Sequence, residues 1–212
     1  MDIVLAAERG YWEELKKAIE AGEDINSKNE DGDTALMRAV YNKRTSFVNE
    51  LIKAGANVNE KNNYQQSPLM WAARNNMIDS VNALIKAGAD VNARTSDGNS
   101  AVLWAVLKDN VDCLDALLKA GADVNTKDKY GTTALMYAAH NGYPRCLTLL
   151  IEAGADVNAT DNKDRTAPIF ATANKFKDCV DILVEAGADP TVGDSKKYIP
   201  FDWAEWYESS DL

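Results

Sequence analysis

The sequence predicts an all-α fold, a solenoid of stacked helix-turn-helix pairs joined by β-turn or hairpin loops. Three observations predict it: a glycine recurs every 33 residues, a helical apolar face precedes each glycine, and a Ser or Thr follows each of the first five. A period of this size is typical of repeat proteins, in which each module buries its apolar face only against its neighbours. The glycines are Gly22, Gly55, Gly88, Gly121, Gly154 and Gly187.

A short first helix is expected to open each module. A Ser or Thr side chain can cap such a helix by accepting a hydrogen bond from its free backbone N–H groups, and Pro68 suits a first helical position, where no N–H is needed. The first module lacks this turn and is expected to begin directly with a helix in "DIVLAAERG". The capping residues are Thr34, Ser67, Ser100, Thr133 and Thr166.

A second helix follows in each module, with aliphatic residues at positions i, i+3 and i+4, as in Val48, Leu51 and Ile52. The recurring glycine comes directly afterwards, where a left-handed residue commonly ends a helix. Stretches rich in Asp, Asn and Gly, such as "KNEDGD", then favour a turn.

The boxes "TALMRA", "SPLMWA" and "TALMYA", together with the ending "AGADVN" and the 33-residue period, resemble the ankyrin repeat over residues 1–207. The resemblance implies an ankyrin-repeat solenoid with a concave protein-binding groove. The chain departs from the family at the histidine of its T-P-L-H-x-A box, which links neighbouring loops, and apolar packing is expected to replace those links. The residues at this position are Met37, Met70, Leu103, Met136 and Ile169.

The period predicts a single ankyrin-repeat domain over residues 1–212. Its modules are expected at about 1–32, 33–65, 66–98, 99–131, 132–164 and 165–197, with a C-terminal half-cap at 198–212. Both ends are expected to be polar caps, because a bare stacking face would aggregate.

Composition and charge exclude several classes of function. The net charge of −10 has the wrong sign for a nucleic-acid binder, and no apolar run approaches the roughly 20 residues that span a bilayer. Three cysteines without a CxxC motif fit a reducing, cytoplasmic location, although nuclear location or delivery into a host cell stays open. Cys113, Cys146 and Cys179 share one second-helix position and are expected to be buried thiols.

No catalytic, cofactor or metal site is predicted. His140 is the chain's single histidine, so a catalytic triad would have to form around it, and no P-loop, GxGxxG or HExxH motif is present. We therefore expect a non-enzyme.

The candidate partner-binding residues form a column at 33-residue intervals, with neighbours on the same helix faces and two tyrosines at turn tips. By resemblance, the column borders the groove; the alternative is that its rings only pack the first helices together. Aromatic and Arg side chains often dominate binding energy. The candidates are Arg38, Tyr41, Tyr64, Trp71, Arg74, Trp104, Leu107, Tyr130, Tyr137, His140 and Phe170.

The turn tips change from acidic at Glu30 and Asp31 to basic at Lys163 and Arg165. Such a gradient can orient a partner, or the tips are simply solvated.

These observations predict a monomeric, non-catalytic module that binds another protein as an adaptor, inhibitor or secreted effector. Two alternatives stay open. One is self-association through the terminal aromatics Trp203, Trp206 and Tyr207. The other, by resemblance, is modification by an asparaginyl hydroxylase at Asn92, Asn125 or Asn158.

Overall fold

The structure, a computed structural model, describes residues 2–189 of the 212-residue chain, and the regular elements of this part are α-helices joined by loops, with isolated β-bridges at Lys28–Thr34 and Lys127–Thr133. The chain divides into two compact units, unit 1 over Met1–Ala122 and unit 2 over Asp123–Leu212. The predicted half-cap at 198–212, with its terminal aromatics, lies outside the described residues. Within residues 2–189, no helix has the length and apolar character needed to cross a membrane.

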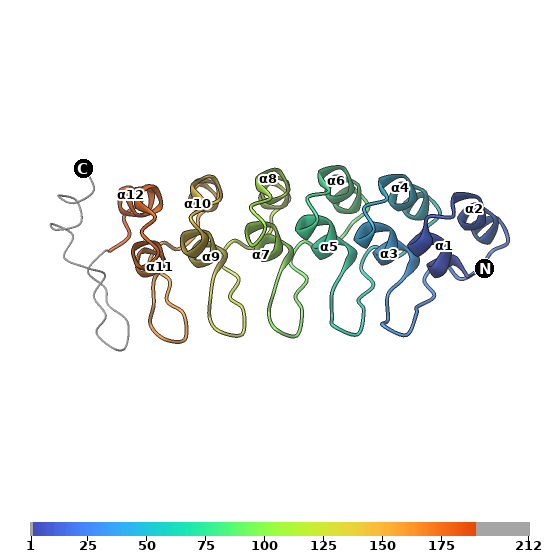
Figure 1. The fold of residues 1–212 in the computed structure, drawn as a ribbon, viewed down its shortest axis with the longest axis horizontal. Helices are drawn as coiled ribbons and strands as arrows, with labels where there is room; N and C mark the ends of the chain where they lie inside the picture. Colours follow the sequence, from blue (N-terminus) through green and yellow to red (C-terminus); the bar gives the residue numbers. More distant parts are fainter. Residues whose placement is uncertain (1, 190–212) are drawn as a thin grey trace. The chain divides into compact units, whose positions relative to one another are not determined.

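Unit 1 stacks its helices in two layers (Figure 1). The first helices α1, α3, α5 and α7 pack side by side, each also contacts the second helix of its own module, and α6 packs between α4 and α8. The helices are α1 (Ile3–Arg9), α2 (Trp12–Glu20), α3 (Ala35–Tyr41), α4 (Thr45–Lys53), α5 (Pro68–Arg74), α6 (Ile78–Lys86), α7 (Ala101–Val106) and α8 (Val111–Lys119).

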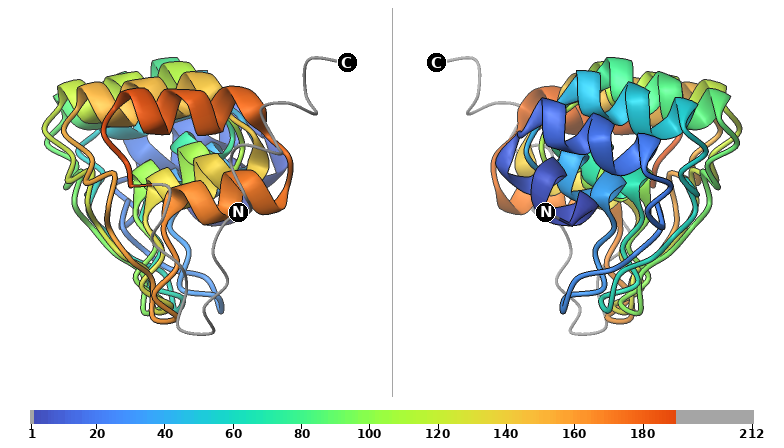
Figure 2. Two further views of the ribbon diagram at one scale, coloured as in Figure 1. Left: turned by 90° about the vertical axis from the view of Figure 1, so that its left-hand side faces the viewer. Right: turned by 90° about the vertical axis from the view of Figure 1, so that its right-hand side faces the viewer.

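Unit 2 repeats this layering with two further helix pairs. Helix α9 packs on α11 in the first-helix layer, and α10 packs on α12 in the second. In each unit the connecting loops project beyond the first helices, away from the second-helix layer (Figure 2). The helices are α9 (Ala134–Asn141), α10 (Pro144–Glu152), α11 (Ala167–Ala173) and α12 (Lys177–Glu185).

Four of the five predicted N-caps of the first helices are confirmed. Thr34, Ser67, Ser100 and Thr133 each accept a hydrogen bond from the backbone N–H three residues ahead, at 3.3–3.4 Å. Thr166 occupies the same position before α11, but its hydroxyl is buried without a hydrogen-bond partner. Each first helix from α3 to α11 therefore has a Ser or Thr at its N-cap, and four of these five residues form the capping bond.

The second helices end as predicted. Each of the six recurring glycines follows the helix in a left-handed conformation, with φ between 72° and 90°. The apolar face is narrower than the sequence suggests: Val48 and Leu51 are fully buried, whereas Ile52 is half-buried. At the same position in α12, Val184 is exposed. The cysteines Cys113, Cys146 and Cys179 are buried on this face, as expected.

The residues that replace the family histidine are buried, which confirms apolar packing at this position. The Met70 and Met136 sulfurs also accept the backbone N–H groups of Ser67 and Thr133 at 3.5 Å. The links between neighbouring loops come from other side chains, which sequence analysis missed.

Lysine side chains make one set of these links. The Nζ atoms of Lys28, Lys61 and Lys127 donate to the backbone carbonyl 33 residues ahead, over 2.8–3.4 Å. Each bond therefore joins equivalent loops of successive modules.

Asparagine side chains make a second set. Asn59 accepts the Asp90 N–H at 2.7 Å and donates to the Gly88 carbonyl at 3.0 Å. Asn125 and Asn158 repeat both bonds, to the carbonyl 29 residues ahead and the N–H 31 residues ahead.

Candidate functional site

Three residues of the predicted column, Arg38, Trp71 and Trp104, lie in unit 1 on the first helices. Arg38 on α3 hydrogen-bonds to Glu8 of the preceding module and, at 3.3 Å, to Asp33 in its own loop. Burial by itself would lower the pKa of Arg38, but these two carboxylates outweigh burial and raise the pKa. The guanidinium also lies 5.2 Å from the centre of the Tyr41 ring. Arg38 is thus a fixed cation that joins two modules.

Ring–ring and guanidinium–ring contacts connect Tyr41, beside Arg38, to Trp71 and Trp104 of the next two modules. Tyr41 meets Trp71 edge to face, with the ring centres 5.0 Å apart. The Arg74 guanidinium lies 5.0 Å from the Trp71 ring centre and 4.9 Å from that of Trp104. We call these five residues, Arg38, Tyr41, Trp71, Arg74 and Trp104, the aromatic–arginine row.

The aromatic–arginine row combines packing with exposure. Trp71 and Trp104 are half-buried, whereas the Tyr41 side chain is 48% exposed. Leu107, just after α7, is half-buried. The rings therefore pack the first helices together and still present an outer edge to solvent.

The two tip tyrosines are exposed, as predicted. Tyr64 is 63% exposed in the loop before α5, and Tyr130 is 59% exposed in the loop before α9. The Lys129 ammonium lies 5.1 Å from the Tyr130 ring centre.

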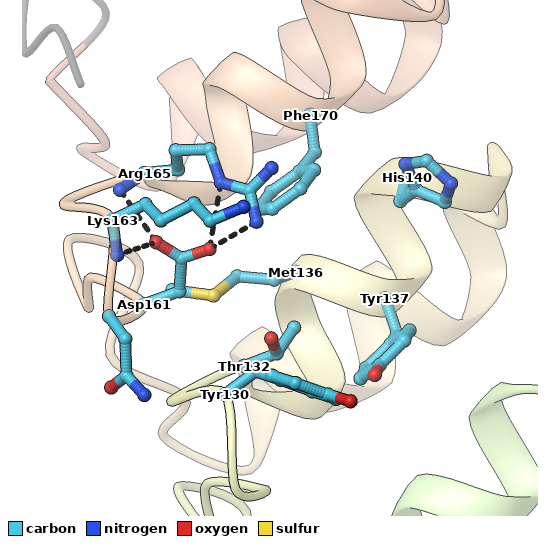
Figure 3. Close-up of a pocket in the computed structure, with 10 residues that line it drawn as sticks. Tyr130, Thr132, Met136, Tyr137, His140, Asp161, Lys163, Arg165 and Phe170 are labelled. Atoms are coloured by element: carbon cyan, nitrogen blue, oxygen red, sulfur yellow. Dashed lines mark hydrogen bonds and ion pairs between the residues drawn. The ribbon is translucent and has the colours of Figure 1, made fainter. Parts of the chain in front are cut away.

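A cavity of about 320 Å³ lies within unit 2, between two neighbouring loops and the first helices α9 and α11 (Figure 3). Four predicted residues come together around it: Tyr130, Tyr137, His140 and Phe170. Six further residues complete its lining: Thr132, Met136, Asp161, Asn162, Lys163 and Arg165. We call this space the loop cavity.

Asp161 organises one wall of the loop cavity (Figure 3). Its carboxylate accepts bonds from Arg165 Nε at 2.8 Å and Nη2 at 2.6 Å, and from the backbone N–H groups of Lys163 and Arg165. Burial would raise the pKa of Asp161, but the bonds and charge of Arg165 lower it on balance. The same guanidinium lies 4.6 Å from the Phe170 ring centre. Sequence analysis missed Asp161 as a site residue; its i, i+4 spacing to Arg165 was the available signal.

Asp128 organises the opposite loop. It accepts the backbone N–H groups of Tyr130 and Thr132 and the Tyr137 hydroxyl, the last at 2.8 Å. Burial, together with the charge of Asp128, raises the pKa of Tyr137 to about 12. Tyr137 therefore remains a neutral donor, and its ring is fixed in the wall.

His140 contacts groups that do not support catalysis. Its ring lies edge to face with Phe170 at 5.8 Å, and its Nδ1 lies 3.2 Å from the Asn174 amide nitrogen. Neither contact supplies a nucleophile or a carboxylate. Over residues 2–189, no group of three or more His, Cys, Asp and Glu side chains is placed to hold a metal ion.

Residues 3–95 and 102–194 each match the family model described as ankyrin repeats (3 copies). Among solved structures, the crystal structure of the ankyrin repeat domain of Bcl-3, described as a unique member of the IkappaB protein family, aligns with a TM-score of 0.84 and 26% identity. That alignment covers 94% of this chain and 92% of the other. No curated protein sequence matches the chain.

Proposed function

Since the chain belongs to the ankyrin repeat family, we propose that it is a non-catalytic module that binds a partner protein through its turn tips and first-helix faces. Ankyrin repeats generally mediate protein–protein interactions and are typically non-catalytic. In this proposal the chain acts as a cytoplasmic monomer, and the partner's identity decides whether it serves as an adaptor, an inhibitor or an effector.

The observation that carries this proposal is the exposure of aromatic side chains where the candidate surface was expected. Among the described residues, the exposed large hydrophobic side chains are Tyr11, Tyr41, Tyr64, Tyr130 and Val184. Three of the five were predicted as binding residues. A tyrosine exposes a large apolar ring and a polar hydroxyl, and both gain from burial in an interface.

The aromatic–arginine row supports the proposal in another way. Arg74 fixes both tryptophan rings, and Arg38 is fixed by its two carboxylates. A surface whose side chains are already ordered loses little conformational entropy when it binds. The row therefore suits a largely rigid docking face.

A pull-down with matched variants tests the proposal. The full-length chain serves as bait in a lysate of its source organism, beside a Tyr41→Ala, Tyr64→Ala, Tyr130→Ala triple variant. Tyr11→Ala is the control, because Tyr11 is an exposed tyrosine in the turn between α1 and α2, outside the candidate surface. We expect a protein captured by the unaltered chain and the control to be lost from the triple variant. Equal capture by all three baits would place binding on another surface.

The asparaginyl hydroxylase alternative stays a prediction. Asn92, Asn125 and Asn158 are exposed, as a modifying enzyme would require. The Asn125 and Asn158 side chains are also bonded to the next module, so an enzyme would first have to separate them from it.

A further inference from the structure

The geometry points to the loop cavity of unit 2 as a binding site for an acidic segment of a partner protein. In this inference one apolar side chain of the segment enters between the rings, and flanking carboxylates face Lys163 and Arg165. The inference rests on the proposed function, because it names the chemistry of the partner that such a module would bind.

The inner wall of the cavity favours an apolar side chain. Tyr137, Phe170 and Met136 line it beside the exposed Tyr130 ring. Its volume of about 320 Å³ is at the small end of the roughly 300–1,000 Å³ range of ligand pockets, so it suits one or two side chains better than a large cofactor.

The wall is also ordered before any partner arrives. The Tyr137 hydroxyl is held by Asp128, and the Phe170 ring lies between the Arg165 guanidinium and His140. An inserted side chain therefore replaces water without having to reorganise these rings, which favours binding.

The charge at the cavity favours carboxylates, although the whole chain is acidic. The Asp161 carboxylate accepts four bonds from Lys163 and Arg165 of its own loop, and its side chain is only 1% exposed. The Asp128 carboxylate accepts two bonds from its own loop and one from the Tyr137 hydroxyl on α9. Lys163 lines the cavity, Arg165 keeps a side chain that is 32% exposed, and Asp164 is the exposed acid of the same loop. The two buried acids are thus held by donors within the protein, and the cations Lys163 and Arg165 both line the cavity.

Three short synthetic peptides test this chemistry. The first has a central phenylalanine flanked by glutamates, the second has alanine at the centre, and the third has lysines in place of the glutamates. Binding to the full chain is followed in two-dimensional amide NMR spectra, which detect weak association. We expect the first peptide to shift the amides of residues 130–140 and 161–170, the second to bind at least about tenfold more weakly because ring burial is lost, and the third not to bind.

A pair of charge reversals on the protein completes the test. Lys163→Glu should weaken binding of the acidic peptide about three- to tenfold. A higher salt concentration should also weaken binding of this peptide to the unaltered chain. Arg145→Glu is the matched control, since Arg145 is an exposed cation on α10 and does not line the cavity. An equal loss of peptide affinity in both variants would mean that only the net charge of the chain matters, and this result would overturn the inference.

Two other outcomes would also overturn it. The alanine peptide could bind as tightly as the phenylalanine peptide, or inorganic phosphate at millimolar concentration could displace the peptide; either would mean that the site binds a simple anion. Failure of the loop-cavity inference can be told apart from failure of the proposed function. A partner that the Lys163→Glu variant still captures, but a Tyr41→Ala, Tyr64→Ala double variant does not, would leave the module a binding protein whose partner avoids the loop cavity, because neither tyrosine lines that cavity.

Discussion

Replacing Asn59 with alanine should weaken the junction between two modules of unit 1 without touching the core. The change removes the Oδ1 atom that accepts the Asp90 N–H at 2.7 Å and the Nδ2 atom that donates to the Gly88 carbonyl at 3.0 Å. The side chain is exposed, so the substitution leaves no buried cavity.

The size of the effect follows from the two bonds. A hydrogen bond contributes about 0.5–1.5 kcal/mol net, and these bonds are solvent-exposed, so we expect a loss of about 1–2 kcal/mol in the free energy of unfolding. In a chain of this length, that corresponds to a decrease of roughly 2–8 °C in Tm.

Urea unfolding followed by circular dichroism measures this loss. Asn82→Ala is the matched control, because Asn82 is exposed on α6, where alanine should be neutral or stabilising by about 0.5 kcal/mol. An Asn59→Ala midpoint equal to that of the control would refute a stabilising role for the asparagine links.

The further predictions concern three unlike features, the buried cysteines, the N-cap threonines and Tyr137. Burial raises the pKa of Cys113 and Cys179 to about 11, so both should resist iodoacetamide at pH 8 in the native state and react in urea, as mass spectrometry would show. Their unfolded pKa lies near 9.0, so unfolding releases protons and stability should fall as the pH rises from about 9 to about 11; a flat profile in a pH series of urea melts would contradict this. Thr133→Ala should cost about 1 kcal/mol through its lost cap bond, whereas Thr166→Ala should be near neutral in the same melts; equal costs would be inconsistent with the different caps. Tyr137→Phe should cost about 1–2 kcal/mol, and ultraviolet titration of the unaltered chain should find one phenol ionising near pH 12 that is missing from the variant.

Sequence patterns predicted the helices well because their signals are local. A hydroxyl before a first helix and a glycine after a second helix act within a few residues of their own position, and the structure confirms both. The exceptions arise where a neighbour decides the outcome. Thr166 has the expected residue type but no cap bond, and Ile52 belongs to the apolar pattern but is only half-buried.

The links between modules were harder to predict because their partners are backbone groups about 30 residues away. Lys28, Lys61 and Lys127 do recur in register, so a column of identical polar residues was an available signal. The loop cavity was predicted only in part. The aromatic residues could be chosen by type, whereas Asp161 carried only its i, i+4 spacing to Arg165 as a signal, and Met136 reaches the cavity from the buried side of α9.

The asparagine links explain why the period is constant. A single side chain such as Asn59 must reach both the carbonyl 29 residues ahead and the N–H 31 residues ahead, while at the tip Asn63 reaches back to the carbonyls of Glu30 and Asp31. A one-residue insertion within a module would disturb partners at both ends, whereas an added module of 33 residues would satisfy all of them. Such a gene can therefore lengthen readily by whole duplications, and short insertions should be selected against.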